Sequence, residues 1–208
     1  MPRLTEYAVP HLWGRLDYSV LGRLQPDGDT IHLREPRLLF AGRVIRPEGG
    51  VLEITMPGRR PQTLELRGDP PSYLPIRLSG LDAPEAHYVA STRPNPHEPA
   101  YPIREKRHFT VCQPHHQPAL AFILRVAARW PNVLVELDRD LVDHRGRVLG
   151  FLYASDQHAE RCTFISLELV RRGLAFPFVF ESAGDYRPRL LSAGARARRD
   201  RLGVWRHY

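Results

Sequence analysis

The stretch IRLSGLDAPE at residues 76–85 joins a short apolar segment to a group of charged side chains. Residues 76–81 predict a short β-strand that leads directly into an acidic turn. Arg77 lies five residues before Asp82, and Glu85 lies three residues after it. The fold class is predicted from the elements that precede residue 76 and from those that follow residue 85.

The chain before residue 76 has the pattern of β-structure. Turn signals rich in proline and glycine occur at residues 26–28, 47–50 and 57–61. Between them lie short segments with strand composition, one of which alternates apolar and polar residues as a half-buried strand does. The predicted strands cover residues 20–24, 30–33, 38–45, 51–55 and 63–66.

After residue 85 a proline-rich segment at 91–102 precedes a mixture of helices and strands. Strands are predicted at residues 133–137 and 148–153. Helices are predicted at residues 118–130, 163–172 and 188–201, the second with Gly173 as its C-cap. Several strands followed by helices mixed with strands predict an α+β fold, mainly β, around a small barrel.

Composition is that of a globular protein. The 208 residues are 42% hydrophobic and 25% charged, and no apolar run reaches the roughly 18 residues of a membrane span. The first residues lack the pattern of a secretory signal, and Cys112 and Cys162 are predicted to be free thiols. We expect a single domain over residues 1–208 that is cytoplasmic, has no membrane partner and acts as a monomer.

The net charge of +7 favours a polyanionic partner. Of the thirty basic residues only Lys106 is a lysine, and arginine binds phosphate through two parallel hydrogen bonds. A genome rich in G and C would also favour arginine codons. The arginines at 196, 198, 199 and 201 could follow a nucleic-acid backbone, but the simpler interpretation is a solvated face of the last helix.

Oxygen ligands for a hard divalent cation are available from two segments. Asp29 follows the turn at 26–28, and Asp82 ends the strand at 76–81. With the backbone carbonyl of Ala83, these carboxylates match the ligand preferences of Ca²⁺ and Mg²⁺. Asp29 by itself could instead cap its own turn.

Further side chains complete the requirements of phosphodiester hydrolysis. Glu85 can orient or deprotonate a water molecule beside the cation. Arg77 and Arg147 come from different segments and can stabilise the negative charge that develops on the phosphoryl oxygens. Each arginine could also form an ordinary ion pair, so it is the combination that favours hydrolysis.

Five segments resemble the staphylococcal nuclease (thermonuclease) family and occur in the order of that family. The internal spacing from arginine to aspartate to glutamate also matches the family. The segments are PDGDT (26–30), IRLSGLDAPE (76–85), DHRGRVLGFLYA (143–154), LELVRRGLA (167–175) and ARARRDRLGVW (195–205).

This resemblance implies a five-stranded OB-type barrel with capping helices and a Ca²⁺-dependent nuclease that acts on DNA and RNA. Mn²⁺ or Mg²⁺ could replace Ca²⁺, because free calcium inside cells is low and both ions suit oxygen ligands. Whether cleavage is endo- or exonucleolytic stays open. The resemblance assigns the metal to Asp29, Asp82 and the Ala83 carbonyl, and catalysis to Arg77, Glu85 and Arg147.

The chain also departs from the family. Residues of about 31–75 and 86–117 are longer than the family's connections and are predicted to be insertions. His144 and Arg145 replace a Lys-Tyr pair, and Phe178 and Phe180 fall near two expected tyrosines, so these four are assigned to substrate binding. Because residues 86–116 leave directly from Glu85, we expect them to narrow the cleft and favour single strands over duplex.

A noncatalytic OB-type module that binds nucleic acid or protein is the alternative function. Such a module has no need of a complete set of catalytic side chains, and this sequence retains the set. The complete set therefore favours the enzyme.

Overall fold

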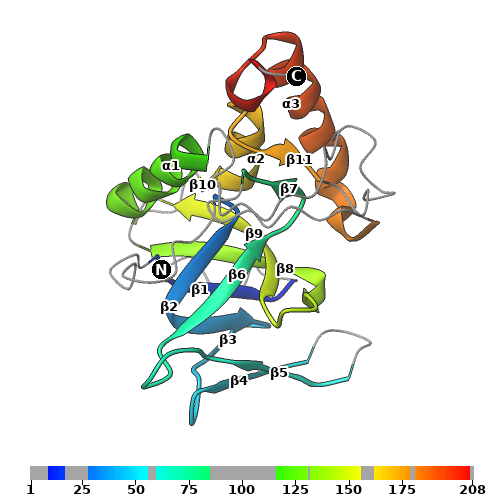
Figure 1. The fold of residues 1–208 in the computed structure, drawn as a ribbon. Coiled ribbons are helices and arrows are strands. Elements are labelled where there is room, and N and C mark those ends of the chain that lie inside the picture. Colours follow the sequence, from blue (N-terminus) through cyan, green and yellow to red (C-terminus); the bar gives the residue numbers. More distant parts are fainter. Residues whose placement is uncertain are drawn as a thin grey trace.

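A closed ring of five strands forms the centre of the protein. The computed structural model describes residues 9–16, 28–55, 60–84, 116–130, 132–155, 162–178 and 181–206. The ring follows the order β1–β8–β9–β6–β2, and pairing of β1 with β2 closes it (Figure 1). Within the ring β6 and β9 run parallel and the other neighbours antiparallel. The predicted α+β class and five-stranded OB-type barrel are confirmed. The strands are β1 (His11–Leu16), β2 (Thr30–Phe40), β6 (Tyr73–Leu78), β8 (Asn132–Val142) and β9 (Val148–Ser155).

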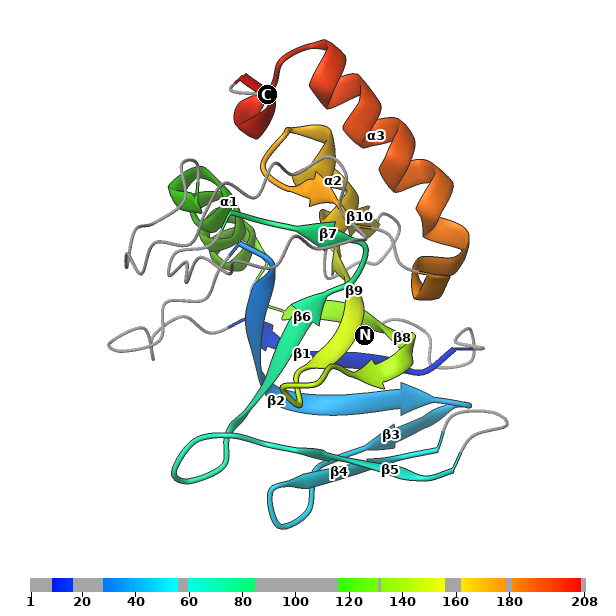
Figure 2. The same ribbon diagram turned by 45° about the vertical axis from the view of Figure 1, so that its right-hand side comes forward.

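Helices gather at one end of this barrel, as Figures 1 and 2 show. Two short strands, β7 (Leu81–Asp82) and β11 (Phe176–Pro177), pair with each other at the same end. Among the described residues, no helix is long and apolar enough to cross a membrane. The helical elements are α1 (His116–Arg129), α2 (Ile165–Arg171), α3 (Arg187–Arg199) and the 3₁₀ helices η2 (Glu181–Tyr186) and η3 (Gly203–Arg206).

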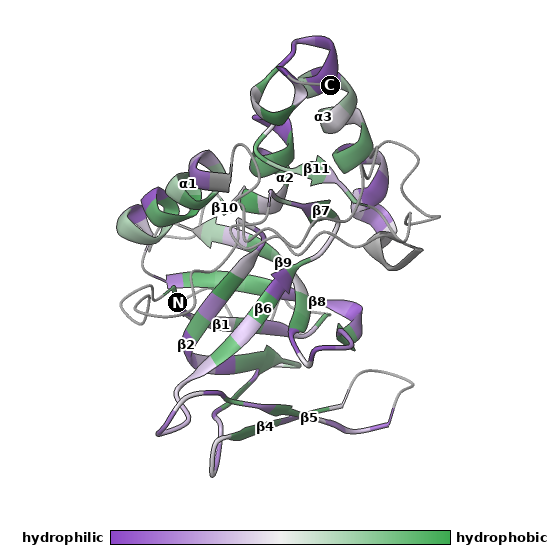
Figure 3. Cartoon of the chain, viewed as in Figure 1, coloured by the Kyte–Doolittle hydropathy of each residue, from purple (hydrophilic) through white to green (hydrophobic). Residues whose placement is uncertain are grey.

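Alternate side chains of the five strands fill the barrel. Leu12, Ile31, Ile76, Val135 and Leu152, one from each strand, have no exposed surface. Figure 3 shows hydrophobic and polar residues alternating along β2 and β6. This period of two sends every second side chain inward. The same hydrophobic cluster continues into α1, α2 and α3, which fixes the helices on the barrel.

A second, two-stranded sheet lies at the end of the barrel away from the helices (Figure 2). It consists of β4 (Val51–Ile54) and β5 (Gln62–Glu65), which form an antiparallel pair. Leu52, Ile54 and Leu64 are almost completely buried in the same cluster as the barrel interior. This part of the segment 31–75 is therefore packed onto the barrel. Residues 31–40 and 73–75 of the same segment belong to the ring strands β2 and β6 themselves.

Several element boundaries differ from the sequence predictions. The predicted strand at 38–45 is wrong as a single element, because Ala41 and Gly42 form a turn between β2 and β3 (Arg43–Ile45). Both turn residues have positive φ, as a tight hairpin requires. The segments predicted at 30–33 and from 38 are one strand, in which Glu35 takes a φ of 49° and the register with β1 shifts.

Other differences concern the ends of the chain and the second helix. Strand β1 was not predicted, since its sequence HLWGRL lacks clear alternation. The helix predicted from residue 163 begins at Ile165, because β10 (Cys162–Phe164) pairs with β9 first. Cys162 is a free, exposed thiol. The strand predicted at 20–24 lies outside the described residues.

Gly173 ends α2 as predicted, and replacing it should destabilise the protein strongly. Its φ is +66°, and an added Cβ would lie 2.2 Å from the backbone oxygen of Leu202. We expect Gly173→Ala to lower the free energy of unfolding by at least about 2 kcal/mol in urea denaturation. Gly42→Ala is the matched control, because Gly42 has a φ of +75° with no atom within 4 Å of the added Cβ. Equal losses for the two variants would contradict a steric role for Gly173.

Candidate active site

Four of the predicted site residues meet near the start of β2, the end of β6 and the start of β9: Asp29, Arg77, Asp82 and Arg147. Thr30 is paired with Arg77 across β2 and β6, and Arg77 is paired with Leu149 across β6 and β9. The amide of Leu78 donates to the carbonyl of Asp29 over 2.7 Å. The register of the ring therefore places residue 29 beside a strand that lies almost fifty positions later in the chain.

Arg77 joins the two predicted metal-binding carboxylates. Its Nη1 lies 2.6 Å from Oδ2 of Asp29, and its Nη2 donates over 2.6 Å to Oδ1 of Asp82. The Asp29 side chain has no exposed surface, while those of Arg77 and Asp82 keep 15% and 27%. Asp29 and Asp82 come from different segments, but their carboxylates lie next to each other because each contacts a different nitrogen of the Arg77 guanidinium.

Asp29 is held by further hydrogen bonds. Its Oδ2 accepts from the amide of Ala83 over 2.9 Å, and its Oδ1 accepts from the Thr30 hydroxyl over 3.2 Å. The first bond joins the start of β2 to the segment that follows β7, across a separation of 54 residues. A buried carboxylate is tolerated because these donors and Arg77 replace its lost hydration.

Arg147 is fixed from two sides. Its Nε donates over 2.7 Å to Oδ2 of Asp143, and its Nη1 donates over 3.0 Å to the hydroxyl of Thr30. Thr30 in turn donates to Asp29. A continuous set of hydrogen bonds and ion pairs thus runs from Asp143 through Arg147 to Asp29 and on to Arg77.

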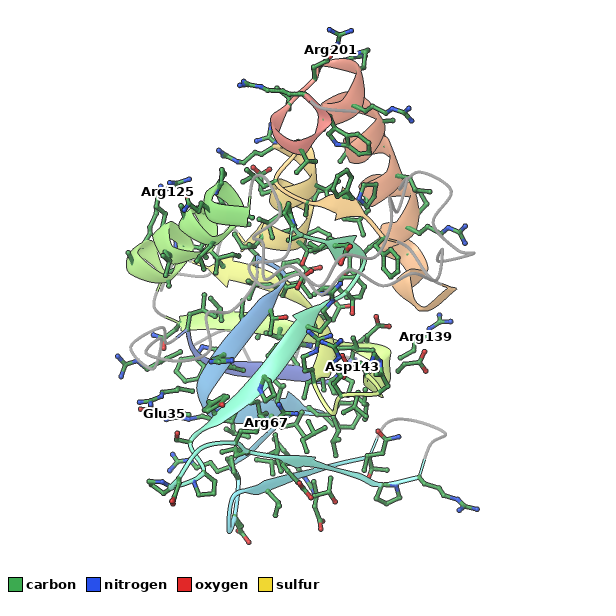
Figure 4. The ribbon with its side chains drawn as sticks, viewed as in Figure 1. Glu35, Arg67, Arg125, Arg139, Asp143 and Arg201 are labelled. Atoms are coloured by element: carbon green, nitrogen blue, oxygen red, sulfur yellow. The ribbon has the colours of Figure 1, made fainter. Side chains whose placement is uncertain are left out.

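The turn that carries Arg147 is organised by Asp143, which Figure 4 labels. Oδ1 of Asp143 accepts from the amides of Arg145 and Arg147, both over 2.9 Å. Gly146 takes a φ of +70° to complete the turn. Burial alone would raise the pKa of Asp143, but the hydrogen bonds and positive charge of Arg147 outweigh it and hold that pKa below its ordinary value.

Asp143→Asn should therefore lower stability in a pH-dependent way. The depressed pKa means that the Asp143 charge stabilises the folded state above the unfolded pKa of about 3.9, and that this contribution is lost as pH falls through the lower folded pKa. We expect a loss of about 1–3 kcal/mol at pH 7 that shrinks toward zero below pH 3.9, measured by urea unfolding between pH 2 and 7.

Asp200→Asn provides a control for this variant. Asp200 pairs with Arg199 on the exposed surface, so the same substitution there should change the unfolding free energy little at any pH. A loss for Asp143→Asn that does not vary with pH would contradict the proposed role of its charge.

Two of the residues in this network were given no role by the sequence. Thr30 connects Arg147 to Asp29, and Asp143 holds Arg147 from its own turn. Asp143 has a sequence signal, because it lies four positions before Arg147 at the start of a glycine turn. Thr30 has none beyond its place directly after Asp29.

The predicted substrate-binding residues are more dispersed. His144 and Arg145 are exposed in the turn after β8, where the carbonyl of Arg145 accepts from Arg67 over 2.7 Å. Phe178 is half-buried after β11, and its amide donates to the carbonyl of Gly80 over 3.0 Å. Glu85, Phe180 and nearly all of the segment 86–117 lie outside the described residues.

The donor chemistry at the site is suitable for a hard cation. Asp29 and Asp82 supply neighbouring carboxylate oxygens, the ligand type that Ca²⁺ and Mg²⁺ prefer. The described residues include no group of three or more His, Cys, Asp or Glu side chains placed to hold an ion. Among the described residues, the oxygen ligands that a cation could use at this place are therefore the two carboxylates that share one guanidinium.

A closed five-stranded barrel with helices at one end, and with two arginines and two aspartates joined at that end, defines an OB-fold-like protein. The family model described as staphylococcal nuclease homologue matches residues 75–207, more than half of the chain. The chain belongs to this family and is related to nucleases, which are hydrolases of nucleic acids. The match includes Arg77, Asp82 and Arg147, whereas Asp29 precedes it. No curated protein matches the chain.

Proposed function

We propose that this protein is a metal-dependent nuclease that hydrolyses phosphodiester bonds in DNA and RNA and prefers single strands. The observation that carries the proposal is the convergence of Arg77 and Arg147 on one pair of carboxylates through a continuous hydrogen-bond network. Hydrolysis of a phosphodiester requires positive charge that stabilises its transition state, and two guanidinium groups beside carboxylates that can bind a cation would supply it.

In this mechanism Asp29, Asp82 and the Ala83 carbonyl would hold the cation. Ca²⁺ is the expected ion, with Mn²⁺ or Mg²⁺ as substitutes, and when bound it supplies positive charge that polarises a phosphoryl oxygen. The contacts with the two nitrogens of Arg77 orient both carboxylates. Asp29 also fixes the backbone amide of Ala83, which lies two positions before Glu85 in the sequence.

Arg77 and Arg147 bind the non-bridging oxygens of the scissile phosphate. Glu85 accepts a proton from the water whose oxygen attacks phosphorus, the bond from phosphorus to the leaving oxygen breaks, and the leaving oxygen takes a proton from solvent. His144 and Arg145 on the exposed turn contact the neighbouring nucleotide, and Phe178 and Phe180 stack on bases. Both arginines are restrained before substrate arrives, which reduces the reorganisation needed for catalysis.

The proposal is tested by incubating the purified protein with plasmid DNA, single-stranded DNA and single-stranded RNA. Each substrate is combined with Ca²⁺, Mn²⁺, Mg²⁺ or EGTA, and products are followed by gel electrophoresis. We expect cleavage that requires a divalent cation and is faster on single strands. Absence of cation-stimulated cleavage under every condition would leave a noncatalytic binding module as the function.

A further inference from the structure

A groove separate from the residues of the candidate site lies between α2 and α3. Its volume is about 370 Å³. Arg171 of α2 and Arg189 and Arg196 of α3 line it together with Ser192. Its remaining lining is apolar and comes from Leu167, Pro188 and Ala193. The groove therefore combines guanidinium groups with an apolar surface.

The arginines are spaced for more than one anionic group. Arg189 and Arg196 are seven positions apart on α3, which corresponds to two helical turns on one face and about 10.5 Å along the axis. Two side chains at this separation suit successive phosphates of a strand better than one isolated phosphate. Arg171 faces them from α2, so the positive charge lies on both sides of the groove.

The charge in the groove is only partly neutralised. Arg171 is paired with Glu168 over 2.7 Å, and Arg172 shares the same carboxylate over 3.2 Å. Arg189 and Arg196 take part in none of the ion pairs formed between described residues, and none of the described residues that line the groove is acidic. The guanidinium of Arg189 lies 5.8 Å from the ring of Phe164, which orients it without removing its charge.

Strand β11 packs between α3 and the strand that carries Asp82. Pro177 of β11 lies against Gly194 of α3, where an added Cβ would come within 2.5 Å of the proline ring. The preceding residue, Phe176, pairs with Asp82 on β7. Figure 1 shows β7 and β11 next to each other, with α3 beside β11. The helix that carries two of the groove arginines is thus packed on the strand pair that includes Asp82.

We propose that the groove between α2 and α3 binds a second segment of a single-stranded nucleic acid, outside the catalytic centre. The arginines contact backbone phosphates, and Leu167, Pro188 and Ala193 contact the sugars and bases that an unpaired strand exposes. This inference rests on the proposed function for its choice of polyanion. It gives Arg196 a role in binding and leaves Arg199, which pairs with Asp200, on the solvated face of the helix.

The test compares two double variants of the same helix. Arg189→Gln with Arg196→Gln removes two charges from the groove. Arg187→Gln with Arg199→Gln removes two charges from exposed positions at the two ends of α3 that do not line the groove. Binding of a fluorescent 20-nucleotide single strand is measured by anisotropy in EGTA at several salt concentrations, so that no cleavage occurs. Circular dichroism verifies that both variants are folded.

We expect the groove variant to bind about fivefold more weakly at low salt. The slope of log affinity against log salt should fall by about 1.4, that is, about 0.7 for each lost phosphate contact, with the control slope unchanged. Equal slopes for parent and groove variant, or equal changes in both variants, would overturn the inference. Displacement of the strand by polyglutamate of equal charge as readily as by unlabelled DNA would also overturn it, because a site that contacts bases must prefer nucleic acid.

A cleavage assay separates this inference from the proposed function. If the parent is a nuclease, the groove variant should cleave a dinucleotide at the parental rate and a long single strand more slowly. If the parent cleaves nothing, the proposed function fails, while the salt slopes still decide whether the groove binds a strand. A dinucleotide rate that falls as much as the long-strand rate would contradict a site outside the catalytic centre.

Discussion

Glu85→Gln should lower the turnover of nucleic acid by about 10²–10⁴-fold and leave nucleic-acid affinity within a few-fold of the parent. The amide has the volume of the carboxylate but cannot accept a proton from water, and loss of a general base has an effect of this size. Glu85 itself lies outside the described residues, but the two residues that precede it are held in place. Pro84 is buried, and the Ala83 amide is bonded to Asp29.

Single-turnover kinetics with a single-stranded substrate measure this effect directly, and anisotropy in EGTA measures affinity. Glu53→Gln is the matched control, because Glu53 is exposed on β4 at the opposite end of the barrel and undergoes the same chemical change. Glu85→Asp should recover part of the rate, since it restores a carboxylate at a shorter reach. Activity of Glu85→Gln within about threefold of the parent would remove Glu85 from the mechanism.

Arg77→Lys should reduce turnover by about 10²–10³-fold although the positive charge is kept. An ammonium group cannot reach Asp29, Asp82 and two phosphoryl oxygens in the planar arrangement that a guanidinium provides. Arg37→Lys is a suitable control, because Arg37 is a half-buried arginine of the same barrel whose guanidinium lies 5.1 Å from the ring of Trp13. Full activity of Arg77→Lys would reduce Arg77 to a structural ion pair.

Arg77→Met separates the structural role of this residue from its catalytic role. The variant removes the ion pair between Arg77 and the fully buried Asp29, so the free energy of unfolding in EGTA should fall by about 3–5 kcal/mol relative to the parent. Saturating Ca²⁺ should recover part of this loss, because the two carboxylates can then bind the ion without competition from Arg77. Urea denaturation with and without Ca²⁺ measures both effects. If Ca²⁺ stabilises the parent and the variant equally, the ion does not bind between Asp29 and Asp82.

Much of the barrel could be predicted from the sequence, because a strand pattern depends on residues that are close together in the chain. Alternation along β2 and β6 follows from a period of two, and Gly173 and Pro118 mark helix ends through their own backbone restrictions. The contact between Arg77 and Asp82 could also be anticipated, since five residues separate them across one tight turn. The family resemblance added the order of the segments, and the match over residues 75–207 agrees with it.

The connections inside the site could not be read from the sequence. Asp29 meets Ala83 and Arg77 because β2 and β6 pair in one particular register, and register depends on packing of the whole barrel. The role of Thr30 appears only when β9 brings Arg147 to the start of β2. The groove between α2 and α3 likewise depends on how two helices cross on the barrel end.

The sequence by itself thus determined the fold class, the family and the kinds of side chain available for chemistry. The fold class follows from local backbone preferences, which neighbouring residues specify, and the family follows from the order of the five segments. The tertiary structure alone decided that Arg77 bridges Asp29 and Asp82, that Thr30 and Asp143 hold Arg147, and that three arginines line one groove. Those arrangements depend on contacts between residues as far as 117 positions apart, which only strand register and core packing can bring together.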